Sequence, residues 1–356
     1  MKTEQDYEIL CDFGNLYAAY RAARKGKRWK DAVAKVEANA LEAVAIIQRE
    51  LSEGTYKPGS YREFYVTEPK RRLIQTNSFK DKIVQHVLCD RILYDTLTRP
   101  FILDNYGSQI GKGTHYGLNR LRGFMQEHYR KTGSADGWVL KADVSKYFAS
   151  INHDILKRDV RELLKDPRTL SLVEAIIDST PNGIGLPIGN QSSQIFALLY
   201  LNKLDHLVKE GLRIKYYGRY MDDFYLIHQD KAVLQEARKI IAQHIGERGL
   251  SLNRKTQIFP LRNGIDFLGF HTYLTDTGKV IRKIRKRSRD QMKRKLRKYA
   301  VMVENGAMTK EQVAESYKSW RAHAEHGNCG SLLAKYDAIY NALFERSNED
   351  DASIHN

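Results

Sequence analysis

The sequence predicts an α+β fold, and two observations support that prediction. Apolar residues recur at helical spacing towards both ends of the chain, whereas short alternating segments separated by helices fill the middle from Trp138 onward. No repeat and no low-complexity linker divides the 356 residues, so we expect them to pack as one continuous unit. Hydrophobic residues make up 42% of the chain, which is enough to bury a core and excludes a wholly disordered protein.

The expected helices share apolar residues every three or four positions, which places those residues on one face. They cover residues 16–20, 32–51, 81–97, 155–164, 193–210, 232–248 and 282–298. The expected strands alternate apolar and polar residues. They cover a basic hairpin at 62–76, a strand from Trp138, a tight hairpin at 215–228 and a strand pair at 264–273. Turn-forming residues at 53–61 and glycines at 105–115 predict loops.

The charge balance favours a polyanionic partner. Lysine and arginine number 59 against 43 aspartates and glutamates, a net charge of +16. No apolar run reaches the roughly 18–20 residues of a membrane span, and the first residues carry no signal-peptide core. We therefore expect a cytoplasmic protein without a membrane partner. Three scattered cysteines predict neither a disulfide framework nor a cysteine-based zinc site.

Three carboxylates form the candidate chemical centre. Asp143 ends an apolar strand, and Asp222 and Asp223 lie side by side in an aromatic hairpin. Adjacent acids beside apolar surface repel each other unless a cation compensates, and Mg²⁺ binds in proteins through one or two carboxylates plus substrate phosphates. Two such ions about 3.5–4 Å apart suit phosphoryl transfer. The plainer interpretation is a turn, where aspartate is common.

The hairpin sequence Tyr-Met-Asp-Asp at residues 220–223 resembles the catalytic hairpin of reverse transcriptases, and Asp143 matches their first palm aspartate. The family's motif order continues from Tyr61 to Ala324. The resemblance implies a right-hand polymerase in which Asp143 and Asp222 bind two Mg²⁺ ions, with Asp223 in support and Mn²⁺ as an alternative ion. The implied parts are an N-terminal helical extension (1–60), fingers (61–136), a palm that includes part of the fingers between its motifs (137–274) and a basic helical thumb (275–356).

The resemblance also implies a set of residues around the incoming deoxynucleoside triphosphate. Phe148, five positions beyond Asp143, would block a ribose 2′-hydroxyl and so select deoxynucleotides. Arg72 and Lys70 would hold the triphosphate, the guanidinium as a bidentate fork and the ammonium as a point charge. The set is completed by Ile188, Gly189, Gln194 and Lys255, the last as a general acid near the leaving pyrophosphate. The plainer interpretations are core packing, a solvated strand edge and an exposed loop lysine.

A second implied set binds primer and template. Its members are Lys112, the primer-grip residues Phe267, Leu268 and Gly269, and the basic-helix residues Arg285, Arg289 and Lys293. Eleven of the seventeen residues from Arg282 to Lys298 are lysine or arginine, and Ile284, Ser288, Met292 and Leu296 would form the inner face of that helix. Phosphate contacts of this kind give affinity without sequence information. Gln109 stands where the family usually has arginine, and Lys112 is the expected partial substitute.

The residue type at position 188 differs between subgroups of the family. In Gly-Leu-Pro-Ile-Gly (185–189) it replaces the glutamine that retroviral and group II intron enzymes place beside the nascent base pair. This segment resembles the reverse transcriptases of diversity-generating retroelements, which copy template adenines unfaithfully. The implied cause is loss of a hydrogen-bonding side chain at the templating base. The alternative is that Ile188 merely packs and that fidelity is ordinary.

The resemblance predicts an RNA-directed DNA polymerase, bacterial or phage-encoded, with an RNA template, a DNA primer and deoxynucleoside triphosphates as substrates. It would make adenine-mutagenised cDNA from a template-repeat RNA for mutagenic retrohoming, with an accessory variability determinant protein as partner. One alternative is a defence-associated reverse transcriptase that copies a noncoding RNA in an anti-phage response. Another is a non-catalytic RNA-binding or splicing factor, which the intact carboxylates and Phe148 disfavour. Phe148 also disfavours an RNA replicase.

Overall fold

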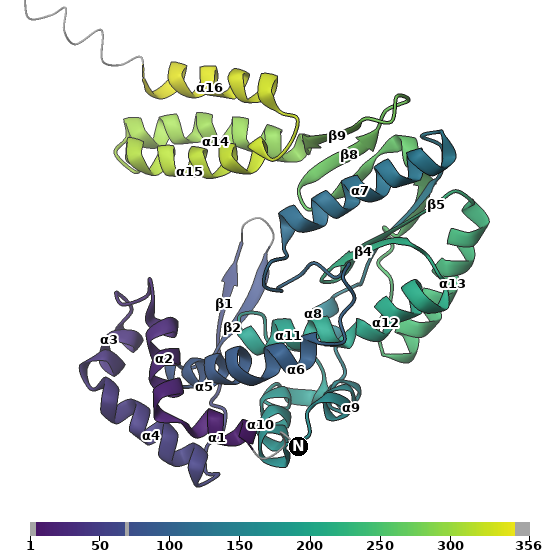
Figure 1. The fold of residues 1–356 in the computed structure, drawn as a ribbon. Helices are drawn as coiled ribbons and strands as arrows, with labels where there is room; N and C mark the ends of the chain where they lie inside the picture. Colours follow the sequence, from purple (N-terminus) through teal and green to yellow (C-terminus); the bar gives the residue numbers. More distant parts are fainter. Residues whose placement is uncertain (1–4, 68–70, 346–356) are drawn as a thin grey trace, which may run out of the picture. The chain divides into compact units, whose positions relative to one another are not determined.

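A computed structural model describes residues 5–67 and 71–345 and confirms the α+β class (Figure 1). The chain forms two compact units, each assembled from separate stretches. The first comprises Met1–Gly113, Ala142–Tyr225 and Gln235–Gln257, and the second comprises Thr114–Lys141, Leu226–Leu234 and Ile258–Asn356. The expectation of one continuous unit is therefore wrong. Sequence patterns do not reveal it, because each unit closes through contacts between distant stretches.

Helices dominate the first unit, and several begin at residues whose side chains cap them. Asp12 accepts from the backbone N–H of Asn15, and Asn152 accepts from that of Ile155. Asp166 caps a helix that has Pro167 at its first position. The helices are α1 (Gln5–Cys11), α2 (Phe13–Arg24), α3 (Asp31–Ala38), α4 (Ala40–Ser52), α5 (Phe79–Leu88), α6 (Tyr94–Thr98), α8 (Tyr147–Ser150), α9 (His153–Leu163), α10 (Pro167–Ile177), α11 (Gln191–Tyr200) and α12 (Asn202–His206). Short π-helices, η1 (Cys89–Leu93) and η3 (Leu207–Gly211), and a 3₁₀ turn, η2 (Pro181–Gly183), complete it.

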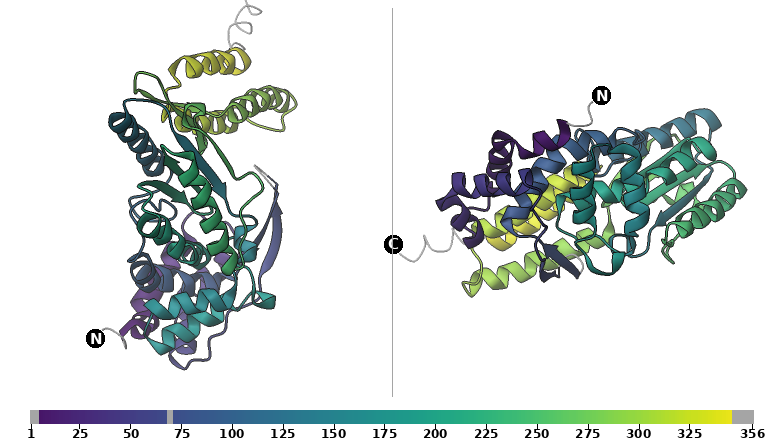
Figure 2. Two further views of the ribbon diagram at one scale, coloured as in Figure 1. Left: turned by 90° about the vertical axis from the view of Figure 1, so that its right-hand side faces the viewer. Right: turned by 90° about the horizontal axis from the view of Figure 1, so that it is seen from below.

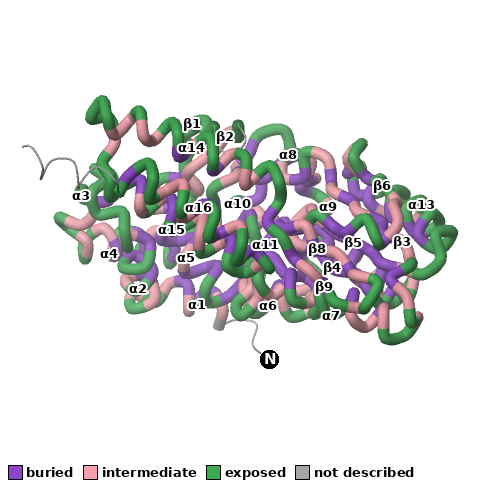
Figure 3. The backbone as a smooth tube through the Cα atoms, turned by 90° about the horizontal axis from the view of Figure 1, so that it is seen from above, coloured by how far each residue is buried: buried purple, intermediate pink, exposed green. Residues whose placement is uncertain are grey.

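Helix α11 corresponds to the first part of the apolar run at 193–210, which was expected to be helical. Its residues from Ile195 to Tyr200 are all buried, and Figure 3 shows it among the buried segments of the tube. The run does not continue as one helix, because α11 ends at Tyr200 and is followed by α12 and η3. A helix that is apolar on all sides belongs in the core.

Within the described residues, the strands form three sheets. Strands β1 (Arg62–Val66) and β2 (Arg72–Thr76) pair antiparallel as the predicted basic hairpin, with Arg62 opposite Thr76. A four-stranded sheet has the order β4 (Tyr216–Tyr220), β5 (Asp223–His228), β3 (Trp138–Asp143) and β6 (Gln257–Pro260). Helix α13 spans Lys231–Glu247. Four of the five residues of β4 and four of the six of β5 are buried, so this hairpin is a core element.

The second unit contains the antiparallel sheet β7 (Ile265–Phe267), β8 (Phe270–Leu274) and β9 (Val280–Ile284), with helix α7 (Thr114–Thr132) and the 3₁₀ turn η4 (Leu261–Asn263). Three helices, α14 (Lys286–Glu304), α15 (Lys310–Glu325) and α16 (Gly330–Phe344), pack side by side, as both views of Figure 2 show. Their shared core contains Met292, Leu296 and Tyr317. Met292 and Leu296 therefore lie on the inner face, as predicted.

The basic helix begins later than predicted. It starts at Lys286, and residues up to Ile284 belong to strand β9, so Ile284 is not part of a helical face. The guanidinium of Arg282 is buried and donates to the carbonyl oxygens of Leu118 (2.7 Å) and His326 (3.2 Å). These acceptors lie far away along the chain, and a local pattern does not show them. Across residues 5–67 and 71–345, no helix is both long enough and apolar enough to cross a membrane.

Candidate active site

The turn between β4 and β5 holds two of the predicted carboxylates in a strained backbone. Met221 adopts a left-handed conformation with φ +55°, which costs energy for a residue with a side chain. Arg219 supports this turn by donating from a guanidinium nitrogen to the carbonyl oxygen of Met221 at 2.9 Å. A buried cation, Arg219, thus stabilises the turn conformation that positions Asp222 and Asp223.

Arg219 is itself held by a buried ion pair. Its side chain is fully buried, and its Nε donates to Oδ1 of Asp205 at 2.6 Å. The hydroxyl of Tyr217 donates to the same oxygen at 2.6 Å. Burial alone would lower the pKa of Arg219, but the Asp205 carboxylate more than reverses this and raises it. Buried charges persist only when they are paired and hydrogen-bonded, so this cluster is a rigid base for the turn.

Asp143 and Asp222 lie against each other. The backbone N–H of Val144 donates to the carbonyl oxygen of Asp222 at 3.2 Å, which joins the end of β3 to the hairpin. The pKa of the Asp222 carboxyl is raised to about 6, first by burial and then by the negative charge of Asp143, while Arg72 opposes the shift. The side-chain amide of Asn253 donates to Oδ2 of Asp143 at 3.1 Å. Two repelling carboxylates are therefore positioned by fixed hydrogen bonds.

This pair fits a divalent cation. Burial first, and then the negative charge of Asp143, disfavour the ionised form of Asp222, and a bound cation would offset both effects. Among the residues that the structure describes, no group of three or more histidine, cysteine or acidic side chains is arranged to hold a metal. The structure thus brings together Asp143 and Asp222, and the supporting role of Asp223 stays a prediction. Two carboxylates suffice for an ion that also binds substrate phosphates.

The Gly185–Gly189 segment lies between two other predicted site elements. The N–H of Leu186 donates to the carbonyl oxygen of Phe148 at 2.7 Å, and the carbonyl oxygen of Ile188 accepts from the N–H of Gln75 at 3.1 Å. Gly189 has φ +134°, and a Cβ at this position would lie 2.9 Å from the carbonyl oxygen of Gln75. Only glycine allows this close approach. The backbone therefore joins the Phe148 region, Ile188 and strand β2.

The structure describes Arg72 and Lys255, two of the basic residues expected to contact the triphosphate. Arg72 is exposed at the start of β2. Its positive charge acts to lower the pKa of the Asp222 carboxyl. Lys70 lies outside the described residues. Lys255 is exposed, and its backbone N–H donates to Oδ1 of Asn253, the residue that also holds Asp143. These contacts bring Arg72 and Lys255 to the neighbourhood of the carboxylate pair.

A cavity of about 950 Å³ lies in the first unit beside the hairpin, bordered by Tyr220, Gly189 and Gln194. The hydroxyl of Ser108 donates to the side-chain oxygen of Gln194, which ties the glycine-rich loop to α11. Its charged lining consists of three lysines, Lys27, Lys82 and Lys112, and two aspartates, Asp90 and Asp95. The lysines outnumber the acids, and a space of this size with a net positive border can accept a polyanionic strand.

The side chains of Gln109 and Lys112 form hydrogen bonds within the loop that carries them. The ammonium of Lys112 donates to the carbonyl oxygens of Ile102 and Asn105 and to the side-chain oxygen of Gln109, at 3.3, 3.1 and 3.1 Å. These three bonds use the three protons of the ammonium, and burial lowers its pKa. In this structure Lys112 organises the loop, and its predicted contact with nucleic acid would require those bonds to open.

The predicted primer and template residues of the second unit lie on two elements that a backbone hydrogen bond connects. Leu268 (φ +47°) and Gly269 (φ +91°) make the turn between β7 and β8, and Phe267 lies under the ammonium of Lys141. The carbonyl oxygen of Gly269 accepts from the N–H of Arg285, which directly precedes α14. Arg285 and Lys293 are exposed and Arg289 is half-buried, four residues apart along the chain.

Several residues of the first site were not anticipated from the sequence. Arg219 and Asp205 support the carboxylates from outside the recognised motifs, whereas Asn253 lies in the same recognised segment as Lys255 but was given no role of its own. The one available signal was an arginine inside an otherwise apolar and aromatic strand, which requires a buried partner. The identity of that partner depends on the tertiary fold.

Comparison with known proteins defines the class. The sequence profile of the family described as reverse transcriptase (RNA-dependent DNA polymerase) matches residues 57–272. Protein YkfC of Escherichia coli (strain K12) is 26% identical over 301 residues, which cover 71% of this chain and 74% of YkfC. The "uncharacterized 91 kDa protein in cob intron" of Schizosaccharomyces pombe (strain 972) is 28% identical over 148 residues, 39% of this chain and 17% of that protein.

Among solved structures, telomerase from Candida albicans in complex with a fragment of telomeric RNA superposes with a TM-score of 0.51 at 13% identity. The match covers 82% of this chain and 55% of the telomerase chain, so this chain spans little more than half of that length. The likeness shows the fold, a right-hand polymerase of helices and antiparallel sheet. The chain belongs to the reverse transcriptase family, and its enzyme class is RNA-directed DNA polymerase. Enzymes of this family use divalent metal ions.

Proposed function

We propose that this enzyme copies a template-repeat RNA into cDNA and makes errors opposite template adenines, for mutagenic retrohoming by a diversity-generating retroelement. The observation that carries the proposal is Ile188 in the segment held between Phe148 and Gln75. A hydrocarbon side chain there offers no hydrogen bond to a base or a sugar. The cytoplasmic, bacterial or phage-encoded setting expected from the sequence belongs to the same proposal, as does an accessory variability determinant protein as partner.

In the proposed reaction the 3′-hydroxyl oxygen of the primer bonds to the α-phosphorus of the deoxynucleoside triphosphate. Pyrophosphate leaves and the hydroxyl proton is lost. Asp143 and Asp222, with Asp223 in support, would hold two Mg²⁺ ions, which when bound stabilise charge on the attacking and leaving oxygens. Arg72 and Lys70 would bind the triphosphate, and Lys255 would give a proton to the leaving pyrophosphate. Phe148 would exclude a ribose 2′-hydroxyl.

RNA is the proposed template, and the basic cavity beside Tyr220 and Gln194 is its proposed path. The telomerase neighbour is described in complex with RNA, which supports the same substrate class. The primer strand is proposed to contact the turn of Phe267, Leu268 and Gly269. The duplex backbone is proposed to contact the exposed cations of α14.

The test is primer extension on a defined RNA template with Mg²⁺ and all four deoxynucleotides, with every product sequenced. We expect errors concentrated opposite template adenines, and Ile188→Gln should reduce them by roughly tenfold, the value of one good hydrogen bond at the base pair. Ile184→Gln is the matched control, because Ile184 precedes the segment and is 48% exposed. Equal and low error rates in all three proteins would reject the mutagenic function and leave faithful cDNA synthesis.

A further inference from the structure

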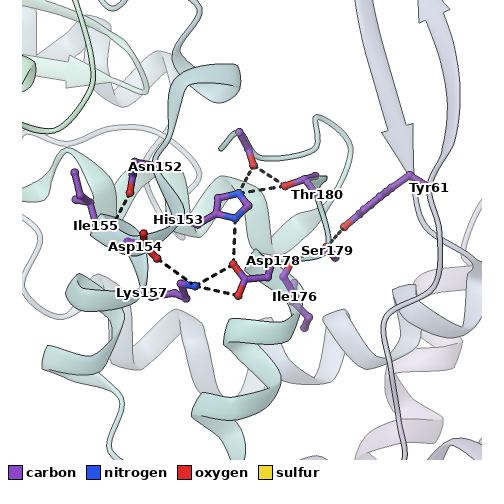
Figure 4. A network of polar contacts seen from close by, with 11 residues as sticks. Tyr61, Asn152, His153, Asp154, Ile155, Lys157, Ile176, Asp178, Ser179 and Thr180 are labelled. Carbon is purple, nitrogen blue, oxygen red and sulfur yellow. Dashed lines mark hydrogen bonds and ion pairs between the residues drawn. The ribbon is translucent and has the colours of Figure 1, made fainter. Parts of the chain in front are cut away.

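A buried histidine lies at the base of the segment that carries Ile188. His153 is the first residue of α9, and 1% of its side chain is exposed. Its Nε2 lies 2.8 Å from the carbonyl oxygen of Gly185, and its Nδ1 lies 3.2 Å from a carboxylate oxygen of Asp178 (Figure 4). The hydroxyl of Thr180 donates to the same Gly185 oxygen at 2.8 Å.

Both ring nitrogens of His153 have polar partners. Besides the Gly185 carbonyl oxygen, Nε2 lies 3.2 Å from the hydroxyl of Thr180, and Nδ1 faces the carboxylate of Asp178. A buried polar ring that is hydrogen-bonded on both sides is fixed in position. The other charged groups at this site are Lys157, which pairs with Asp178 at 3.0 Å, and Asp154, which pairs with Lys157 at 3.5 Å.

The same short stretch anchors the other end of the segment. The hydroxyl of Tyr61 lies 2.6 Å from that of Ser179, which follows Asp178, and it accepts from the side-chain amide of Asn190 at 3.2 Å. Residues 178–180 thus hold the segment 185–189 at its first residue, Gly185, through His153, and just after its last residue, at Asn190, through Tyr61. Between these anchors the segment bonds to Phe148 and Gln75.

We propose that His153 is a positioning residue that sets substrate selectivity by fixing the carbonyl of Gly185. Loss of the imidazole removes its hydrogen bond to this carbonyl and loosens the segment against Phe148, the proposed ribose gate. Selection of deoxynucleotides over ribonucleotides should therefore weaken when His153 is replaced. The effect on selectivity rests on the proposed role of Phe148, but the effect on the order of the segment does not.

The first experiment measures the order of the segment directly in the full chain. Amide hydrogen exchange of residues 184–190 should be faster in His153→Gln by roughly tenfold, the value of one good hydrogen bond. Unchanged exchange would overturn the proposal.

The second experiment measures selectivity as the ratio of kcat/KM for a deoxynucleotide to that for its ribonucleotide. In His153→Gln the ratio should be lower than in the wild type by roughly tenfold. His128→Gln is the matched control, because His128 is also buried beside a backbone carbonyl but belongs to the second unit. A ratio in His153→Gln equal to the control would reject the positioning role.

Asp178→Asn gives a second route if His153→Gln does not fold. Asp178 is 48% exposed, so the change is tolerable, and it removes the carboxylate that faces Nδ1 of His153. It should reproduce both the faster exchange and the lower ratio. Phe148→Ala separates the two proposals: an unchanged ratio there rejects the ribose gate, while the exchange results still decide the positioning role of His153.

Discussion

The carboxylate site and the basic helix α14 are built in opposite ways. Asp222 is presented by a strained turn that the buried cation Arg219 supports, and Asp143 is held by Asn253. The cations of α14, by contrast, are mostly exposed, and the helix is held mainly through its apolar face, with hydrogen bonds from side chains of α15 and α16. Position is thus controlled by buried polar groups at one site, whereas the other presents solvated charge, which suits affinity for a polyanion. Variants should divide accordingly into those that change the rate and those that change binding and its salt dependence.

The largest effect is expected at Arg219. Arg219→Met leaves the Asp205 carboxylate buried without its cation, which should lower the free energy of unfolding by about 3–5 kcal/mol in urea titrations. Adding Asp205→Asn removes the stranded charge and should restore part of that stability. It does not restore the bond to the carbonyl oxygen of Met221, so primer extension should stay impaired. Recovery of activity together with stability would show that Arg219 serves folding alone.

Gly189 should give the next largest effect. Gly189→Ala forces a Cβ to 2.9 Å from the carbonyl oxygen of Gln75 at φ +134°, so kcat/KM for deoxynucleotides should fall about ten- to a hundredfold. The control Gly183→Ala also has a positive φ, +66°, but a Cβ there meets nothing within 4 Å. It should change kcat/KM by less than about threefold. Equal losses would assign the effect to backbone conformation instead of the contact with β2.

The carboxylate pair predicts a dependence of stability on pH. The pKa of Asp222 is about 6 in the folded protein against an ordinary value of 3.8, so folding takes up a proton between those values. Without metal, the protein should lose stability as the pH rises from about 4 to about 6. Asp222→Asn should then be more stable than the wild type at pH 7–8 by on the order of 1–3 kcal/mol. Thermal unfolding with and without Mg²⁺ checks this, since Mg²⁺ should stabilise only the wild type; a less stable variant would contradict the account.

The smallest effects are expected on α14. Arg285→Ala and Lys293→Ala should each weaken binding of an RNA–DNA duplex and reduce the slope of log affinity against log salt by about one, with kcat unchanged. Lys239→Ala is the control, because Lys239 is exposed on α13 and pairs with Glu236. Fluorescence anisotropy across a salt series measures the slope. A change in kcat without a change in slope would contradict the division between the two sites.

Local patterns predicted most of the elements. The hairpin at 215–228, the strand ending at Asp143 and the amphipathic α9 follow from alternation and helical spacing. Strand β9 was missed because its residues belong to a lysine- and arginine-rich run that reads as a helix. Arg282 shows the physical reason, since its strand position is stabilised by carbonyl oxygens from α7 and from the end of α15, which no local pattern reveals.

The site was predicted unevenly for the same reason. The pairing of Asp143 with Asp222 was expected from the resemblance, and their contact is seen. Lys112 was expected to contact nucleic acid, but its bonds to Ile102, Asn105 and Gln109 depend on how the loop closes. His153 gave no signal at all, because its partners Asp178 and Gly185 lie 25 and 32 residues away.

The most direct test of the central claim is primer extension by an Asp222→Ala/Asp223→Ala variant on a defined RNA template. Wild-type enzyme should extend the primer with deoxynucleotides, and the variant should bind primer–template equally but extend it below detection. Glu236→Ala, a change at an exposed carboxylate of α13, should leave extension intact. Extension by the double variant at the wild-type rate would contradict the assignment of the carboxylate pair as the polymerase site.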